Sequence, residues 1–379
     1  MNELTWVEIS KNALQNNIRQ FHNIITPPTL LCACVKANAY GHGLLESANI
    51  LLGAGAGWLS VNALYEARCL RAAGITAPLY ILGYVHDDDL AEVVDLDCRL
   101  IVYNNETINK IGAITDRTQK TARVHIKLET GTHRQGISPH DLIDFARRAA
   151  QFQNIVIEGL ATHFADIEDT TDHSFAEMQL ARFKKSAAAL DDAGIHVPIK
   201  HCANSAATIL FPTTHFSMVR VGIACYGMWP SNETYVSYVK ERKNNFTLIP
   251  GLTWKTRIAQ VKDVPAGEYI GYGRTYRTSH TTKLAVLPVG YYDGYDRGVS
   301  CGHVLIHGKR AAIRGRICMN ILMVEITDIP EARVGDEVVL IGRSHEESIT
   351  AEQFARWAGT INYEVTTRIN DRIPRIVVP

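Results

Sequence analysis

Leu30–Gly43 has the sequence LLCACVKANAYGHG, an apolar run that stops at Lys36. Six apolar residues in succession are typical of a short strand buried on both faces of a parallel sheet. A lysine at the end of such a strand cannot easily stay both dry and charged, so it either reaches solvent or takes part in chemistry. The polar and flexible residues from Asn38 to Gly43 favour a cofactor beside this amine over plain solvent.

The same pattern, a short apolar run followed by an amphipathic segment, recurs through the first 230 residues or so. A strand at residues 4–9 and a helix capped by Ser10 come first. The strands predicted after them are 30–35, 58–61, 78–82, 99–103, 124–128, 155–162, 199–202 and 218–225. Eight β-then-α units over roughly 200–250 residues have the size of a closed barrel. The sequence therefore predicts an α/β fold with an N-terminal (β/α)8 TIM-type barrel.

The pattern changes after about Pro230, where strands and turns replace the alternation. The predicted strands are 252–261, 283–289, 303–306, 310–313, 321–326 and 337–341, and no helix is expected before residues 350–358. We therefore predict a barrel over residues 1–235 and a C-terminal mainly β domain over residues 236–379. The strand within residues 1–10 is a candidate to pack on the β domain.

Composition narrows the class of protein. The chain has 379 residues, and its 39 Lys and Arg balance 39 Asp and Glu, so neither a nucleic-acid nor a membrane partner is expected. The eight cysteines include no CxxC pair, which favours reduced thiols and argues against a metal site. His303 and His307 lie on a predicted strand about 13 Å apart, too far to share an ion. Without a signal-peptide pattern or an apolar run long enough to span a bilayer, we expect a soluble cytoplasmic protein.

Polar residues gather where the predicted barrel strands end. These residues are Lys36, Arg134, His163, Asn204, Ser205 and Arg220. In a closed barrel the carboxyl ends of all strands open on one face, and active sites lie there. Side chains that are far apart in the sequence are thus expected to meet at one site.

Several stretches resemble motifs of the alanine racemase family and recur in order along nearly the whole chain. They are VKANAYGHG (Val35–Gly43), KLETGTHRQG (Lys127–Gly136), HCANSAA (His201–Ala207), VRVGIACYGMWPS (Val219–Ser231), GYGRTY (Gly271–Tyr276), LPVGYYDGYDR (Leu287–Arg297), GRICMN (Gly315–Asn320) and INYEVTTRI (Ile361–Ile369). The resemblance implies a pyridoxal-phosphate (PLP) barrel, a C-terminal β domain, a small amino-acid substrate and a homodimer with active sites shared between subunits.

The resemblance also assigns the catalytic residues. Lys36 would bind PLP covalently and act as the base on one face of the substrate, and Tyr272 would act on the other, because racemisation removes a proton from one side of Cα and returns it to the other. His163 would hydrogen-bond the tyrosine and lie near the cofactor ring. Arg220 would face the pyridine nitrogen, where a guanidinium cannot give up a proton and so weakens the electron sink.

Further residues are assigned by the same motifs. The phosphate would be held by Tyr40, Ser205, Tyr363, Gly222 and Ile223, with Asn204 orienting the neighbouring chain. Arg134 would reach the substrate carboxylate, and Lys127 matches a lysine that is carboxylated in some members. Tyr291 and Met319 would contact the substrate from the β domain of the partner subunit.

Two stretches depart from the commonest family pattern. Glu129 and His133 replace the usual aspartate and small residue, and Asn320 stands where many members have aspartate. With asparagine at this position, the chain is similar to racemases of broader specificity. The resemblance therefore implies an enzyme that interconverts L- and D-alanine, with a broader-specificity or serine racemase as the alternative. A PLP-barrel amino-acid decarboxylase or a non-catalytic PLP carrier is less favoured, because the former lacks these motifs and the latter lacks a second domain.

Overall fold

The computed structural model describes residues 3–241, 245–299 and 301–379, which form two compact units. The barrel unit consists of Leu14–Ala39 and Ser47–Ile249. The β unit consists of the N-terminal residues up to Ala13, Tyr40–Glu46 and Pro250–Pro379. The chain therefore passes from the barrel unit to the β unit and back within the segment that follows Lys36.

Eight parallel strands form the barrel unit, in the order β8-β7-β6-β5-β4-β3-β2-β9. Their bounds are β2 Leu30–Cys34, β3 Trp58–Val61, β4 Leu79–Ile81, β5 Cys98–Val102, β6 Ala122–Lys127, β7 Ile155–Ala161, β8 Ile199–His201 and β9 Met218–Val221. The eight predicted strands are confirmed. The predicted extension of the last strand to Cys225 is wrong, because the chain leaves the sheet at Gly222 and continues as the 3-10 helix η3 (Ile223–Tyr226).

Backbone hydrogen bonds also connect β8 and β9, the two strands at the ends of this order. The N–H of Ser217 donates to the Lys200 carbonyl over 3.1 Å, and the N–H of Arg220 donates to the Ala203 carbonyl over 3.1 Å. Side chains from five strands fill the interior in one cluster, formed by Cys32, Trp58, Tyr80, Ile101 and Met218. The interior is therefore a packed core, as closed barrels require.

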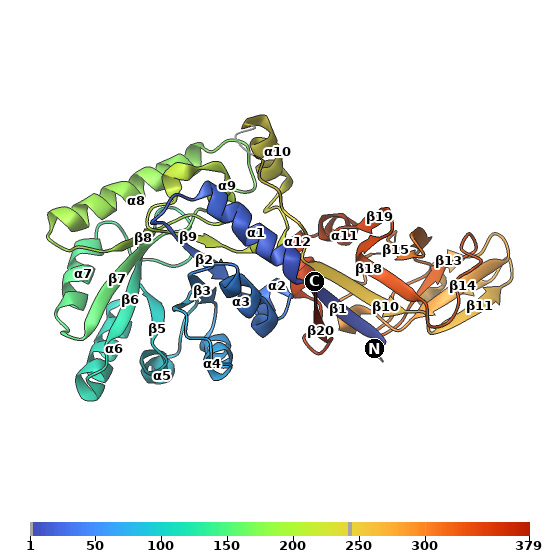
Figure 1. Cartoon of the computed structure of the whole chain (residues 1–379), viewed down its shortest axis with the longest axis horizontal. Helices are drawn as coiled ribbons and strands as arrows, with labels where there is room; N and C mark the ends of the chain where they lie inside the picture. Colours follow the sequence, from blue (N-terminus) through green and yellow to red (C-terminus); the bar gives the residue numbers. More distant parts are fainter. Residues whose placement is uncertain (1–2, 242–244, 300) are drawn as a thin grey trace. The chain divides into compact units, whose positions relative to one another are not determined.

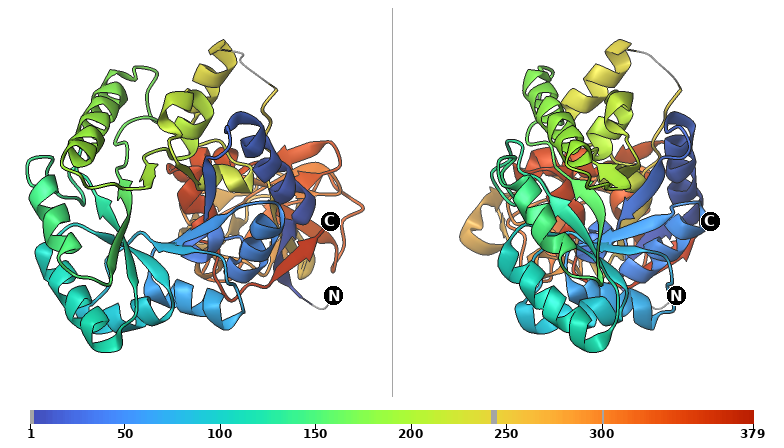
Figure 2. Two further views of the ribbon diagram at one scale, coloured as in Figure 1. Left: turned by 60° about the vertical axis from the view of Figure 1, so that its left-hand side comes forward. Right: turned by 90° about the vertical axis from the view of Figure 1, so that its left-hand side faces the viewer.

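Helices of the barrel unit lie outside its strands (Figure 1; Figure 2). Their bounds are α1 Lys11–Ile24, α3 Leu44–Gly53, α4 Leu64–Ala72, α5 Leu90–Asp95, α6 Asn105–Thr118, α7 Leu142–Ala150, α8 Ser174–Asp192, α9 Ser205–Leu210 and α10 Asn232–Glu241. The element labelled α2, Lys36–Tyr40, is instead a turn with left-handed backbone angles. In α7 the buried residues are Leu142, Phe145, Ala146 and Ala149. This spacing places apolar side chains on one helical face, which packs on the sheet.

The β unit is built on a sheet in the order β16-β15-β18-β10-β1-β20, with β19 paired to β18. β1 (Thr5–Ser10) lies between antiparallel β10 (Leu252–Arg257) and parallel β20 (Arg375–Val378). The other strands of this sheet are β15 His303–Ile306, β16 Lys309–Ala312, β18 Glu337–Ser344 and β19 Glu347–Ile349. Buried and partly buried residues alternate along β10, so one of its faces packs in the core.

Two smaller sheets and two helices complete the β unit. The strands are β11 Gln260–Val264, β14 Thr282–Leu287 and β17 Leu322–Glu325 in one sheet, and the pair β12 Tyr269–Ile270 and β13 Tyr276–Arg277 in the other. The helices are α11 Ala351–Ala358 and α12 Asn362–Thr367. The mainly β character predicted for this part of the chain is confirmed.

The structure corrects three details of the sequence-based prediction. Helix α10 begins at Asn232, where no helix was expected, and the single strand predicted over residues 252–261 is two strands, β10 and β11, because the chain turns between them. His307 lies in a turn with a φ of 50° instead of on a strand, and its ring Nε2 contacts Asp336 Oδ2 over 2.7 Å.

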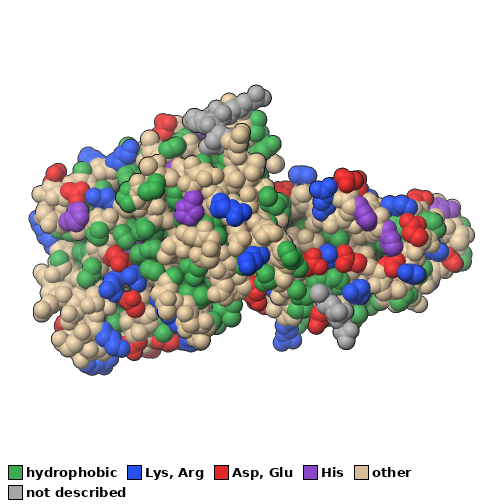
Figure 3. Space-filling model, in the orientation of Figure 1, with side chains coloured by type: hydrophobic (Ala, Val, Ile, Leu, Met, Phe, Trp, Pro, Cys, Tyr) green, Lys and Arg blue, Asp and Glu red, His purple; other side chains and the backbone are tan. Residues whose placement is uncertain are grey.

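The surface shows no strong bias of charge on the face drawn in Figure 3, where acidic and basic side chains are interspersed. This pattern agrees with the equal numbers of acidic and basic residues in the sequence. No described helix is both long enough and apolar enough to cross a bilayer.

Candidate active site

Lys36 lies at the end of β2, at the start of an unusual backbone segment. Ala37, Asn38, Ala39 and Tyr40 all have positive φ, between 52° and 54°, so the chain makes a left-handed turn directly after the lysine. Such a conformation costs an L-residue about 1–2 kcal/mol, and a run of four such residues needs support from the surrounding structure. Strain of this kind concentrates at functional sites.

Glu66 in the first turn of α4 supplies part of that support. One carboxylate oxygen accepts the N–H of Ala37 over 2.6 Å, and the other accepts the N–H groups of Asn62 and Ala63 over 2.7 and 3.1 Å. The Glu66 side chain is buried. It therefore ties the turn after Lys36 to the loop after β3, and so fixes where the lysine leaves the strand.

Replacing Glu66 with alanine is expected to lower the free energy of unfolding by about 3 kcal/mol, because buried N–H groups lose their acceptor. Urea denaturation of the purified protein measures this change. Glu66→Gln keeps one acceptor oxygen and should lose less. An alanine variant as stable as the parent protein would contradict this role of Glu66.

Four basic side chains lower the pKa of His163, which follows β7. Loss of hydration is the largest cause, and the positive charges of Lys127, Arg220, Arg134 and Lys36 add to this effect, so the pKa of His163 is well below its usual value. His163 is therefore neutral near pH 7 and can accept a hydrogen bond. The basic side chains near this neutral ring make this end of the barrel a suitable place for an anionic ligand.

Arg220 on β9 is buried, and its guanidinium donates to an imidazole and to backbone carbonyls instead of to carboxylates. Its Nη1 donates to Nδ1 of His201 over 2.5 Å, and its Nη2 donates to the carbonyls of Thr162 and Cys202 over 2.9 and 3.2 Å. Nη2 also lies 3.4 Å from Nδ1 of His163. Within the described part of the chain, no carboxylate forms an ion pair with this guanidinium. The positive charge is thus positioned but not neutralised.

Lys127 ends β6, and its side chain is buried. Burial lowers the pKa of its amine well below the usual value, and the charges of Arg220 and Arg134 lower it further. Among the residues that the structure describes, no acidic side chain forms an ion pair with it. Burial of this kind favours the neutral form of the amine, and a neutral amine is a nucleophile.

The residues predicted to bind a phosphate from the barrel lie together after β8 and β9. The Ser205 hydroxyl accepts the N–H of Gly222 over 3.0 Å, and the N–H of Ile223 follows in η3. Asn204 caps α9 by accepting the Ala207 N–H over 2.9 Å, and its amide donates to Glu168 over 2.8 Å. Burial raises the pKa of Glu168 to about 7, and the neighbouring charge of Asp169 adds to the shift.

Tyr40 and Tyr363 come together within the β unit. Their ring centroids lie 6.1 Å apart. Segment 40–46 is held to this unit by Arg375, whose Nε donates to the Gly41 carbonyl over 3.1 Å. Gly41 has a φ of 86°, and a Cβ placed there would lie 1.9 Å from the Thr366 carbonyl oxygen. Glycine at this position therefore lets Tyr40 approach the helix that carries Tyr363.

Tyr291 and Met319 stand on loops that are bonded to each other in the β unit, which also carries Tyr272. The N–H groups of Tyr291 and Tyr292 donate to the carbonyls of Cys318 and Met319 over 3.1 and 2.9 Å. A Cβ at Gly290 would lie 2.2 Å from the Cys318 carbonyl oxygen, so this contact requires glycine. The side chains of Tyr272, Tyr291 and Met319 are 68%, 39% and 56% exposed, which is high for apolar groups carried on tightly bonded loops.

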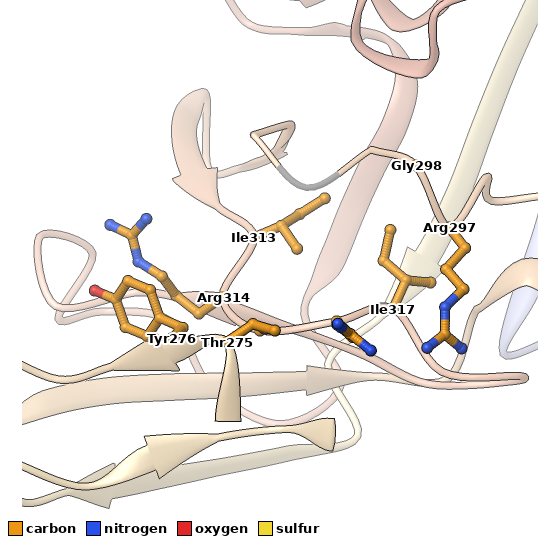
Figure 4. Close-up of a pocket in the computed structure, with 9 residues that line it drawn as sticks. Thr275, Tyr276, Arg297, Gly298, Ile313, Arg314 and Ile317 are labelled. Carbon is orange, nitrogen blue, oxygen red and sulfur yellow. The ribbon is translucent and has the colours of Figure 1, made fainter. Parts of the chain in front are cut away.

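Next to this group, the β unit contains a cavity of about 510 Å³ (Figure 4). Arg297, Arg314 and Arg316 are among the residues that line it. The Arg314 guanidinium lies 4.7 Å from the centre of the Tyr276 ring, and Arg297 lies 5.8 Å from that of Tyr291. Several guanidinium groups around one opening favour an anion such as a carboxylate.

Reasoning from the sequence missed Glu66 and gave no role to His201. The signal for Glu66 was its place three residues after the start of an amphipathic segment, where a glutamate bonds the backbone at the beginning of a helix. The signal for His201 was a polar residue at the end of a strand predicted for the barrel, where a buried ring requires a hydrogen-bond partner.

Comparisons with known proteins cover both units. Residues 9–230 match the profile of the alanine racemase N-terminal domain, and residues 251–377 match that of the C-terminal domain. The chain is 41% identical to the alanine racemase of Methanococcus maripaludis, over 98% of each chain, and 40% identical to that of Desulfovibrio desulfuricans, again over 98% of each. The crystal structure of alanine racemase from Bacillus anthracis with bound L-Ala-P has a TM-score of 0.93 at 36% identity, covering 100% of this chain and 96% of that one.

Proposed function

Because this chain belongs to the alanine racemase family, we propose that it interconverts L- and D-alanine with PLP as its cofactor. The observation that supports this function best is the group of basic side chains, with Arg220 buried among them, whose charges act on His163 at the ends of the barrel strands. Basic groups of this kind suit a phosphorylated cofactor and an amino-acid carboxylate.

The residues of the barrel unit fit PLP chemically. The Ser205 hydroxyl and the N–H groups of Gly222 and Ile223 would hold the phosphate. Tyr40 and Tyr363, which belong to the β unit, are proposed as further hydroxyl donors. Arg220 would face the pyridine nitrogen as a fixed cation without a carboxylate, and Asn204 would orient the chain beside it. Bound PLP withdraws electron density from Cα of an amino acid and makes its Cα–H acidic.

Lys36 is proposed to attach the cofactor and to move a proton at its Nζ on one face of the substrate. Tyr272 is proposed to move a proton at its phenolic oxygen on the other face, with neutral His163 as its hydrogen-bond partner. Arg134 would hold the substrate carboxylate. Two bases on opposite faces allow the enzyme to run in both directions.

The residues Tyr272, Tyr291 and Met319 are proposed to serve the active site of a partner subunit in a homodimer. Their exposure on rigid loops supports this proposal. Light scattering during gel filtration tests it, since a monomer that racemises alanine would contradict shared sites. A cytoplasmic location remains a prediction from the sequence.

Lys127 is proposed to be carboxylated by CO2. Its burial beside Arg134 and Arg220 without an acidic partner among the described residues supports this modification, because a carbamate would supply the missing negative charge. Refined crystallographic density at this side chain tests it. An unmodified amine at atmospheric CO2 would contradict it.

The proposed function is tested by incubating the purified protein with PLP and L-alanine and resolving the enantiomers by chiral chromatography. Formation of D-alanine up to a racemic mixture is expected. Bound PLP without turnover would instead indicate a carrier, and release of CO2 from a panel of amino acids would indicate a decarboxylase.

Asn320 is expected to widen the range of substrates. Its amide donates to Asp293 over 3.3 Å, which an aspartate at this position could not do, because two carboxylates would face each other. Asn320→Asp should therefore lower kcat/KM for serine relative to alanine by about fivefold. This ratio corresponds to an interaction free energy of about 1 kcal/mol from one added charge near the substrate. A substrate panel with both proteins measures this ratio, and equal ratios would contradict the role of Asn320.

A further inference from the structure

Three hydrogen bonds inside the barrel connect Arg220 to Glu158. Nη1 of Arg220 lies 2.5 Å from Nδ1 of His201, Nε2 of His201 lies 2.8 Å from Nδ1 of His125, and Nε2 of His125 lies 3.2 Å from Oε2 of Glu158. Both histidine side chains are fully buried. The series therefore passes from Arg220 through two buried rings to Glu158, whose side chain is 15% exposed.

The two ends of this series determine the direction of every hydrogen bond in it. Arginine only donates, and an ionised carboxylate only accepts. His201 must therefore accept at Nδ1 and donate from Nε2, and His125 must do the same. Adding a proton to either ring would place two donors against each other at one of the contacts. Both rings are thus required to be neutral and protonated at Nε2.

The fold makes room for this arrangement. A Cβ at Gly159 on β7 would lie 2.2 Å from Nδ1 of His125, so the ring occupies space that only glycine leaves free. The register between β6 and β7 shifts between Val124 and His125, which turns this one residue relative to its neighbours. The Tyr80 ring packs on both imidazoles, with centroids 4.7 and 5.4 Å away.

Glu158 is held in its charged form at the far end of the series. Arg99 donates from Nε to Oε2 over 3.1 Å and from Nη2 to Oε1 over 3.4 Å. Burial alone would raise the pKa of this carboxyl, but the hydrogen bond from His125 and the charge of Arg99 bring the pKa below its usual value. The acceptor that ends the series is therefore present throughout the neutral pH range.

We propose that Glu158, His125 and His201 form a one-way hydrogen-bond series that holds the guanidinium of Arg220 in place, with His125 and Glu158 as positioning residues for the reaction. Neither His125 nor Glu158 is placed to touch the substrate, so they act through His201 and Arg220. The effect on turnover rests on the proposed function. The protonation pattern of the two rings does not.

The first measurement is therefore the protonation of the rings. The protein is labelled with 15N-histidine, and long-range 1H–15N correlation spectra are recorded with and without PLP, with assignments from His→Gln variants. We expect His125 and His201 to carry their proton on Nε2 and to remain neutral between pH 6 and 8. A proton on Nδ1 of either ring would overturn the proposal.

The second measurement uses pairs of side chains of nearly equal size, of which only one can hydrogen-bond. His125→Gln and Glu158→Gln keep an acceptor, whereas His125→Met and Glu158→Met do not. We expect each methionine variant to shift the ring signals of His201 and to lower kcat about tenfold, which corresponds to the loss of one hydrogen bond to a charged group. The glutamine variants should keep most of the parent kcat. Equal spectra and equal kcat within both pairs would overturn the proposal.

Glu92 on α5 provides a matched control, because it also forms a two-point contact with an arginine, Arg68, over 2.6 Å at each oxygen. Glu92→Met should change neither the His201 signals nor kcat. If the parent protein forms no D-alanine while the ring protonation is as expected, the proposed function fails and the hydrogen-bond series stands.

Discussion

Replacement of Lys36 by alanine is expected to reduce racemisation of alanine by a factor of about 10⁴ or more, because removal of a residue that both attaches the cofactor and moves the proton leaves no substitute nearby. Lys127 ends a different strand, β6, and its amine lies beside two arginines, so this amine cannot replace that of Lys36. The same variant should lose the absorption band of covalently bound PLP. Initial rates of D-alanine formation and an absorption spectrum of the dialysed protein measure both effects.

A second lysine on a barrel strand provides the control for this experiment. Lys200 on β8 forms an ion pair with Asp191 over 2.9 Å and takes no part in the site. Lys200→Ala should keep the absorption band and the rate. Racemisation by the Lys36→Ala protein at more than a few per cent of the parent rate would contradict the role of Lys36.

Gly41→Ala is expected to have the largest effect on stability of any single methyl group added to the segment after Lys36. The new Cβ would lie 1.9 Å from the Thr366 carbonyl oxygen, and the φ of 86° is itself unfavourable for alanine. Because the obstacle is backbone, the segment must move away from α12. We expect a loss of about 3 kcal/mol from strain and the lost contacts together.

Thermal denaturation with and without PLP measures this loss, and the variant should also bind PLP more weakly, because Tyr40 moves with the segment. Gly53→Ala is the matched control: nothing lies within 4 Å of a Cβ at that position, and its φ is not positive. An unchanged melting temperature for Gly41→Ala would show that segment 40–46 adapts without cost.

Much of the barrel could be predicted because its strands are buried on both faces. Such strands appear in the sequence as short apolar runs, for example Trp58–Val61, whose four residues are all buried. Helix α10 was missed because exposed apolar residues such as Tyr235 and Val239 obscure its amphipathic pattern. The division of residues 252–261 into two strands depends on pairing with β1 and β14, which no local pattern reveals.

The candidate site was predictable to the extent that its residues end strands. Lys36 stands where an apolar run stops and Arg220 lies in the last predicted strand, and the barrel geometry then implies that they meet. Lys127 was assigned only by the family resemblance. The left-handed turn after Lys36 was not predictable, because alanine and tyrosine rarely adopt positive φ and the turn is supported by a long-range hydrogen bond to Glu66. Long-range contacts of this kind leave no periodic trace in a sequence.

The position of β1 between β10 and β20 has a consequence for folding during synthesis on the ribosome. The first strand to be synthesised ends at Ser10, yet its two neighbours in the sheet begin at Leu252 and Arg375. At about 5–20 residues per second, translation takes roughly ten seconds or more to deliver the nearer neighbour. The nascent N-terminus must remain unpaired and shielded over that interval, while the barrel that separates it from its partners is already able to fold.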